Sequence, residues 1–95
     1  MSNLSKADEM FEELGYRVSE EVSEQIDKYG CGIQFKKEMA VTTRYIEFYY
    51  YHKQICIYED QYIDDKVIRH DSCLLNVQEL QAINQKCKEL GWLDE

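Results

Sequence analysis

The sequence contains no proline and only four glycines in its 95 residues. No Gly- or Ser-rich linker or low-complexity segment interrupts it, so we expect residues 1–95 to form a single domain. The chain also lacks any apolar run close to the ~20 residues of a membrane helix. Its first residues, Met1–Lys6, lack the basic and apolar regions of a signal peptide. These absences predict a soluble cytoplasmic protein.

Histidine occurs twice and cysteine four times, and no two cysteines have the Cys-x-x-Cys spacing of many zinc and redox sites. Two pairs, His52 with Cys56 and His70 with Cys73, are separated by an interval typical of zinc fingers. In strands, however, positions 52 and 56 share a face whereas positions 70 and 73 do not. We therefore expect no metal site. The four cysteines are predicted to be free thiols, because no export signal supports disulfides.

Glycine-rich phosphate loops and local catalytic signatures are absent as well. With two histidines and four cysteines, a thiol and an imidazole that meet in the fold are expected by chance. Acidic pairs such as Asp64-Asp65 are typical of a solvated turn, because an acid/base dyad needs burial to separate its pKa values. The sequence thus predicts a protein that is not an enzyme and uses no cofactor.

Positive charge is also scarce, since 19 acidic residues oppose 11 basic ones and the formal net charge is −8. The first 27 residues hold eight acids against two bases, a net charge of −6. Such a surface repels nucleic-acid phosphates and attracts basic protein surfaces. We therefore expect no direct nucleic-acid binding. The alternative is that these acids only keep a small domain soluble.

The last twenty residues carry the start and stop signals of a helix. Asn76 and Glu79 have the spacing of a capping box, and Gly91 before Trp92 suits the helix end. A core-facing stripe is predicted from the apolar periodicity: Val77, Leu80, Ile83, Cys87 and Leu90. The opposite, solvent-facing side is expected to carry Gln78, Gln81, Gln85, Lys86 and Lys88.

A first helix is predicted over residues 6–14, with Ser5 and Asp8 at capping-box spacing and Gly15 at its end. Its apolar face carries Ala7, Met10, Phe11 and Leu14, and its acidic surface carries Asp8, Glu9, Glu12 and Glu13. If the two helices lie side by side, Lys86 and Lys88 are expected to offset Glu12 and Glu13. Residues 17–29 fit a helix, a loop or an edge strand, and we favour a strand or an irregular segment.

From residue 32 onward the sequence becomes rich in β-branched and aromatic residues that alternate with polar ones. Strands are predicted around 33–35, over 44–51 and over 54–59, and the last two must be antiparallel because the gap between them is short. An acidic turn is expected at 60–66, followed by a last strand within 67–75. The predicted fold class is α+β: an N-terminal helix, an antiparallel sheet of three to four strands, and a C-terminal helix packed on one face of the sheet.

The alternation places most tyrosines on the sheet face opposite Ile46, Phe48, Ile55 and Ile57. If the helices cover only that apolar face, the other face is an exposed patch that carries Tyr45, Glu47, Tyr49, Tyr51 and Tyr58. Tyrosine provides a large contact area at low entropic cost and is enriched at interfaces. The alternative is that these tyrosines only pair with one another across half-exposed strands.

The segments Met10-Phe11-Glu12-Glu13-Leu14-Gly15-Tyr16 and Gln78 to Trp92 (QELQAINQKCKELGW) resemble a family of small, largely uncharacterised proteins. These proteins are carried by phages, prophages and conjugative elements of low-GC Gram-positive bacteria. The resemblance is strongest at the two ends, and the middle matches only in its β character. Its motifs are helix caps and core faces, so it assigns no functional residue. It implies an accessory gene product of a mobile element, in a bacterial cytoplasm.

This context favours a non-enzymatic inhibitor that binds a host or defence-system protein, in the manner of anti-CRISPR proteins that block nucleic-acid channels. The partner would present a basic groove, and neither a membrane nor direct nucleic-acid binding is expected. The predicted contact residues are Glu12, Glu13, Glu20, Glu21, Glu24, Tyr45, Glu47, Tyr49, Tyr51 and Tyr58. The alternative is a small self-associating accessory domain whose tyrosine face forms a homodimer.

Overall fold

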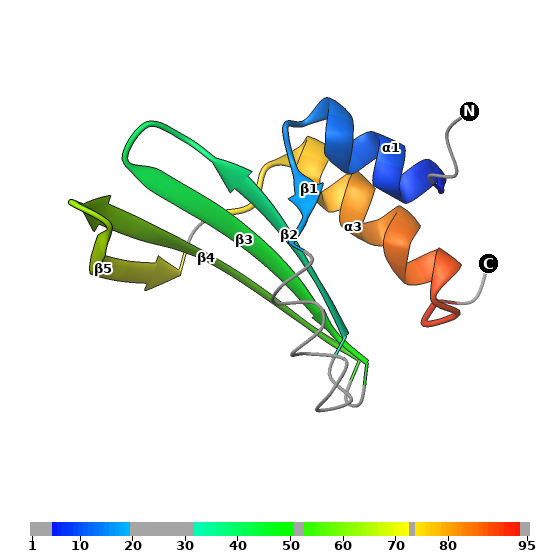
Figure 1. Cartoon of the computed structure of the whole chain (residues 1–95). Helices are drawn as coiled ribbons and strands as arrows, with labels where there is room; N and C mark the ends of the chain where they lie inside the picture. Colours follow the sequence, from blue (N-terminus) through cyan, green and yellow to red (C-terminus); the bar gives the residue numbers. More distant parts are fainter. Residues whose placement is uncertain (1–4, 20–31, 51–52, 73, 94–95) are drawn as a thin grey trace.

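The computed structural model describes residues 5–19, 32–50, 53–72 and 74–93. Its elements are, in chain order, α1 (Lys6–Glu13), β1 (Arg17–Val18), β2 (Gly32–Glu38), β3 (Thr42–Tyr49), β4 (Gln54–Ile63), β5 (Lys66–Ser72) and α3 (Val77–Glu89). The five described strands form one antiparallel sheet in the order β1-β2-β3-β4-β5. Both described helices lie on one side of strands β2 and β3. The edge strand β5 lies on the opposite side of these two strands (Figure 1). The predicted α+β class and the two terminal helices are confirmed.

The predicted number of three to four strands is wrong, because the sheet has a fifth strand, β1. In β1, Arg17 pairs with Lys36 and Val18 with Phe35. The N–H of Ser19 continues this pairing with a 2.9 Å hydrogen bond to the carbonyl of Gln34. The strand lies at the start of the segment 17–29, for which a strand or an irregular segment is favoured, but two residues are too few to show alternation and to be counted as a strand of the sheet. Residues 20–29 lie outside the described residues.

The acidic turn is also shorter than the predicted 60–66. Strand β4 continues to Ile63, and its last residues pair with β5, where Tyr62 faces Val67 and Ile63 faces Lys66. Only Asp64 and Asp65 remain between the strands, and both have positive φ, 52° and 65°. Aspartate tolerates this left-handed conformation, which suits a two-residue hairpin turn.

The predicted helix ends are confirmed. The Asn76 side chain accepts a 2.8 Å hydrogen bond from the N–H of Glu79, whose carboxylate accepts one from the N–H of Asn76 at 3.1 Å. Gly91 has a φ of +75°, and the N–H of Trp92 donates to the carbonyl of Cys87 at 2.9 Å. Helix α1 ends in the same way through Gly15, and both ends are Schellman motifs.

The core lies between the helices and the adjacent sheet face. Phe11 of α1 stacks on Phe35 of β2 with ring centroids 4.2 Å apart, and both rings meet Phe48 of β3 edge-on. The remaining buried apolar residues of the core are Ala7, Tyr16, Ile46, Ala82, Ile83 and Cys87. The predicted division of β3 into an apolar face and a tyrosine face is therefore confirmed for its described residues.

The predicted orientation of the last helix is partly wrong. Val77 and Leu80 are 69% and 51% exposed, whereas Glu79 and Lys86 are only 4% and 9% exposed. The buried side of α3 is Glu79, Ala82, Ile83, Lys86 and Cys87. Apolar periodicity therefore predicts the burial of Ile83 and Cys87 correctly but misplaces the first turn of α3. The reason is that Glu79 and Lys86 have charged partners inside the fold.

Lys86 provides one of these partnerships. Its ammonium lies 3.1 Å from Oδ1 of Asp8 on α1 and 5.7 Å from the ring centroid of Phe35. The expected position of Lys86, on the outer surface where it would offset Glu12 and Glu13, is therefore wrong, and Lys86 pairs with Asp8 instead. The carboxylate of Glu89 adds a second link between the helices, since it accepts a 2.9 Å hydrogen bond from the N–H of Ala7.

Candidate functional site

Helix α1 presents the acidic surface that the sequence predicts. Glu9, Glu12 and Glu13 are exposed. Beside them, a groove of about 160 Å³ runs between the two helices and is lined by Met10, Glu13, Leu14, Gln78 and Gln81. The carboxylate of Glu13 therefore adjoins apolar side chains and neutral amides. Of the predicted contact residues, Glu20, Glu21 and Glu24 lie outside the described part of the chain.

The predicted tyrosine patch is on the expected sheet face, but its centre is buried. Glu47 is 6% exposed and Gln34, its neighbour on β2, is 2% exposed. The Glu47 carboxylate accepts hydrogen bonds from the Tyr58 hydroxyl at 2.8 Å, from the Gln34 amide at 2.5 Å and from the Tyr49 hydroxyl. Tyr51 lies outside the described residues. The buried Glu47 carboxylate thus fixes the positions of the surrounding tyrosine hydroxyls through hydrogen bonds.

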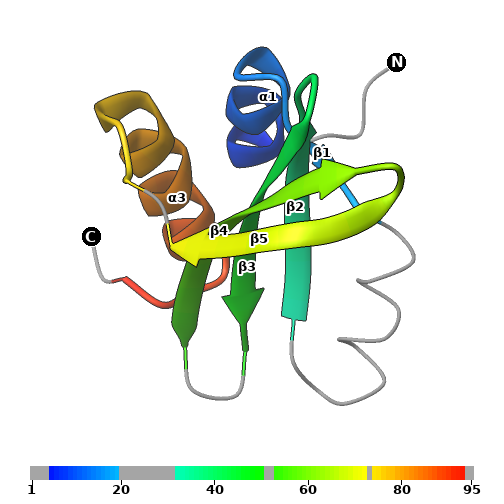
Figure 2. The same cartoon turned by 90° about the vertical axis from the view of Figure 1, so that its left-hand side faces the viewer.

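The β4–β5 hairpin passes over part of the same face (Figure 2). The rings of Tyr45 and Tyr58 are stacked at 4.8 Å, and the Tyr58 ring lies 4.8 Å from the imidazole of His70 on β5. Asp60 holds that imidazole through a 2.5 Å contact to Nδ1. Tyr45 and Tyr58 are consequently half-buried, and they pair across neighbouring strands.

Burial, followed by hydrogen bonding, raises the pKa values of Tyr45 and Tyr58. The Tyr45 hydroxyl lies 2.9 Å from that of Tyr62, and the Tyr58 hydroxyl donates to Glu47. Both tyrosines therefore stay neutral at physiological pH and offer ring edges rather than charge.

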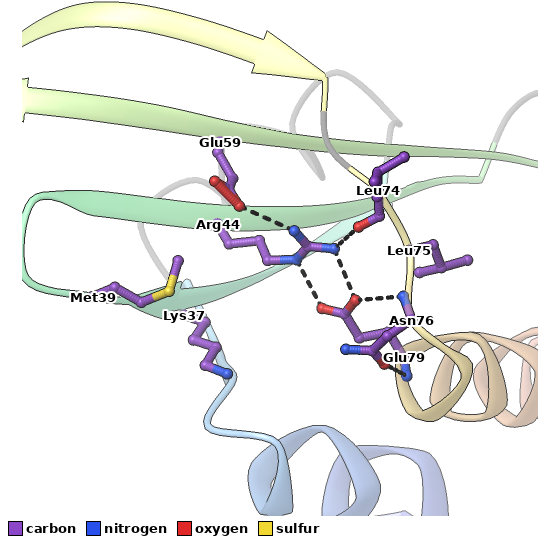
Figure 3. A pocket seen from close by; sticks show the side chains of 8 residues that line it. All are labelled: Lys37, Met39, Arg44, Glu59, Leu74, Leu75, Asn76 and Glu79. Atoms are coloured by element: carbon purple, nitrogen blue, oxygen red, sulfur yellow. Dashed lines mark hydrogen bonds and ion pairs between the residues drawn. The ribbon is translucent and has the colours of Figure 1, made fainter.

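A second polar cluster, which sequence reasoning missed, surrounds Arg44 on β3 (Figure 3). Its Nε and Nη2 donate to the two carboxylate oxygens of Glu79 at 2.7 and 2.8 Å. Its Nη1 donates to Glu59 of β4 at 3.0 Å, and its Nη2 also reaches the carbonyl of Leu74. A pocket of about 300 Å³ adjoins the cluster, lined by Lys37, Met39, Arg44, Glu59, Leu74, Leu75, Asn76 and Glu79.

Glu79 is the centre of this cluster. Burial favours its neutral form, but hydrogen bonds from the Tyr16 hydroxyl, the backbone of Asn76 and Arg44 outweigh burial and lower its pKa. Burial also raises the pKa of Tyr16, with Glu79 contributing in the same direction. Because the guanidinium and both carboxylates face one another, the cluster ties the sheet to α3 and supplies no activated nucleophile. The capping-box spacing in the sequence predicts that Glu79 caps α3, but it does not predict the ion pair with Arg44.

The cysteines show no activation in the described residues. Cys56 is exposed and Cys87 is buried, both are free thiols, and burial raises both pKa values. No group of three or more His, Cys, Asp or Glu side chains in the described residues is placed to hold a metal ion. His52, Cys31 and Cys73 lie outside that part of the chain. Among the described helices, none combines the length and apolar character needed to cross a membrane.

No protein-family model, curated protein or solved structure matches this chain.

Proposed function

We propose that this chain is a non-enzymatic protein-binding accessory factor of a phage or mobile element. It acts as a counter-defence inhibitor of the anti-CRISPR kind, by occupying a basic nucleic-acid groove on a bacterial host or defence-system protein. The observation that carries the proposal is the position of the exposed Glu13, which lines the groove between α1 and α3 and follows the exposed Glu12 in the sequence.

The charges on α1 are available to a partner in different degrees. Asp8 is paired with Lys86 inside the fold, whereas Glu9, Glu12 and Glu13 extend into solvent. An uneven acidic field on a protein of net charge −8 accelerates encounter with a basic surface and repels nucleic acid. The partner favoured by this surface is therefore a protein that itself binds nucleic acid.

The groove adds an apolar component to this charge. A partner's arginine or lysine can lay its aliphatic stem on Met10 and Leu14 while its charged head meets Glu13. The amides of Gln78 and Gln81 supply further hydrogen-bond acceptors at the rim. Such a groove would bind a basic side chain more tightly than a free cation, because the aliphatic stem adds apolar contacts to the ion pair.

The tyrosine face has a secondary role in the proposal. Glu47 is buried, and the hydroxyls of Tyr45, Tyr49 and Tyr58 already bond within the protein. Only their half-exposed rings remain for a partner. We therefore place the principal contact on α1.

The experiment is affinity capture from a bacterial host lysate, with and without nuclease treatment, using three forms of the tagged protein. The wild type is compared with Glu12→Lys/Glu13→Lys and with the control Asp64→Lys/Asp65→Lys, which changes the net charge equally at the hairpin turn. Thermal unfolding of each form verifies that the fold is retained.

The proposal requires capture of a nucleic-acid-binding protein that survives nuclease. The α1 variant must lose it while the control keeps it, and added DNA or RNA must compete with capture. Equal capture by all three forms would contradict an acidic contact on α1. Binding of the purified chain to nucleic acid alone would contradict the charge argument.

A further inference from the structure

Strand β5 is an open edge of the sheet. No strand among the described residues pairs with its outer side, and all seven of its residues are exposed. The opposite edge of the sheet is different, because β1 has only two residues. Natural proteins commonly shorten edge strands or interrupt them with proline or bulges, since a long free edge is a template for another strand. β5 has seven residues without proline or glycine. Its pairing with β4 shifts register at Ile68, because Gln61 pairs with Arg69 and Tyr62 with Val67, and the part from Arg69 to Ser72 is regular.

Contacts with β4 also hold β5 in an extended conformation. His70 is fixed on its inner side by Asp60 at 2.5 Å and by the Tyr58 ring at 4.8 Å. The pairing of β5 with β4 is regular from Ser72, opposite Tyr58, to Arg69, opposite Gln61, and it resumes beyond the register shift at Val67, opposite Tyr62. An incoming strand would therefore meet a preformed template, which lowers the entropic cost of association.

We propose that β5 pairs antiparallel with β5 of a second copy of this chain, around a two-fold axis at His70. In this register Arg69 of each copy lies opposite Asp71 of the other, so that two pairs of opposite charge flank the axis. The proposal is independent of the proposed function, since it uses neither α1 nor the groove beside it.

The register follows from symmetry and charge. An axis perpendicular to the sheet matches residues on the same face, so it must pass through a residue rather than between two. Centring on Arg69 places the two guanidinium groups against each other, and centring on Ile68 puts the axis at the register shift of β5, where regular pairing is interrupted. Only the His70-centred register of these three matches opposite charges, and opposite charges across strands stabilise the pair whereas like charges do not.

Arg69 and Asp71 are suited to this exchange of partners. Within one chain they form an ion pair of 2.5 Å, with side chains 69% and 53% exposed. The same two charges discourage pairing with unrelated strands, since few sequences present the complementary order at the same spacing. They therefore select a second copy of β5 over other edges.

The overall charge does not oppose this arrangement. Helix α1, with its exposed glutamates, lies on the side of the sheet away from β5 (Figure 1). Pairing through β5 keeps the acidic helices of the two copies apart. The long-range repulsion of two chains of net charge −8 is then weakened by salt.

The test is sedimentation equilibrium and multi-angle light scattering on the purified full chain at several concentrations and at physiological salt. The wild type is compared with Arg69→Asp, with Asp71→Arg and with the double exchange Arg69→Asp/Asp71→Arg. Each single variant replaces two attractive pairs by two repulsive ones, and the exchange restores attraction. All substituted side chains are exposed, and circular dichroism with thermal melting verifies the fold.

We expect a dimer for the wild type, a dissociation constant raised about tenfold or more in each single variant, and recovery in the double exchange. A monomeric wild type at every concentration would overturn the proposal. A dimer unaffected by the single variants would place the interface elsewhere and overturn it too. Failure of the exchange to restore the dimer, with the fold intact, would refute the register.

Discussion

Arg44 and Glu79 form a bidentate ion pair across the boundary between the sheet and α3, with nitrogen–oxygen distances of 2.7 and 2.8 Å. Their side chains are only 12% and 5% exposed. The Glu79 carboxylate also binds Tyr16 and the backbone at the start of α3. One buried carboxylate therefore joins β3, the start of α3 and Tyr16, which lies between α1 and β1.

Replacing Glu79 by Gln should destabilise the protein by about 3 kcal/mol, because it removes the more buried of the two carboxylates that face the Arg44 guanidinium and leaves Glu59 in place. Urea denaturation measures the change. Gln78→Ala on the exposed side of the same helix is the control, and it should change stability by about 0.5 kcal/mol or less. Equal effects of the two substitutions would show that the ion pair contributes nothing beyond helix propensity.

Acid should destabilise the protein over the range in which Glu79 becomes protonated. Burial opposes ionisation, but Tyr16, Asn76 and Arg44 lower the pKa of Glu79 below its ordinary value of 4.5 in the folded state. The ionised form therefore contributes stability above pH 4.5, and this contribution is lost as the pH falls through the lower folded-state pKa. Urea midpoints measured from pH 7 downward should show a steeper loss for the wild type than for Glu79→Gln. Parallel profiles would exclude Glu79 as a source of the acid sensitivity.

Two glycine substitutions should differ sharply in cost. Gly91 has a φ of +75° with open space around its Cα, so alanine there should cost about 1 kcal/mol from the backbone conformation alone. Gly32 has a φ of +140°, and a Cβ there would overlap the backbone carbonyl of Phe48. Gly32→Ala should therefore cost several times more than Gly91→Ala, about 3 kcal/mol or above. Thermal melts of the two variants give the ranking, and a reversed order would contradict the close approach of β2 to β3.

Thiol labelling should distinguish the two described cysteines. In a Cys31→Ser/Cys73→Ser background, the exposed Cys56 should react with a thiol reagent in the folded protein, and the buried Cys87 only after unfolding. Because burial and Glu47 raise the pKa of Cys56, its reaction should be slower than that of a small free thiol at the same pH. Rapid labelling of both thiols under native conditions would be inconsistent with the packing of α3.

Local signals predicted the elements of this fold better than their orientation. Residues such as Asn76, Gly15 and Gly91 act within a few neighbours, so the helix ends were predictable from spacing alone. The rotation of α3 about its own axis depends on Glu79 and Lys86. These two residues are buried because they pair with Arg44 and Asp8, which lie on segments distant in the sequence. Hydrophobic periodicity contains no information about such partners.

The candidate surfaces divide in the same way. Exposure of Glu12 and Glu13 follows from the amphipathic pattern of a short helix, and the structure agrees. The burial of Glu47 beneath the tyrosines does not follow from alternation, because it depends on Gln34 and on the return of the β4–β5 hairpin over that face. A two-residue strand such as β1 likewise has no periodicity of its own.

The contacts between the two terminal helices impose an order on the making of this protein. Phe11 and Ala7 are completely buried, and Ala7 donates to Glu89, 82 positions later. During synthesis, α1 leaves the ribosome before α3, so its apolar side has no complete covering until α3 has been translated. The acidic outer surface of α1 keeps this waiting segment in solution. Helix α1 is thus synthesised well before α3 and reaches its native position only with it.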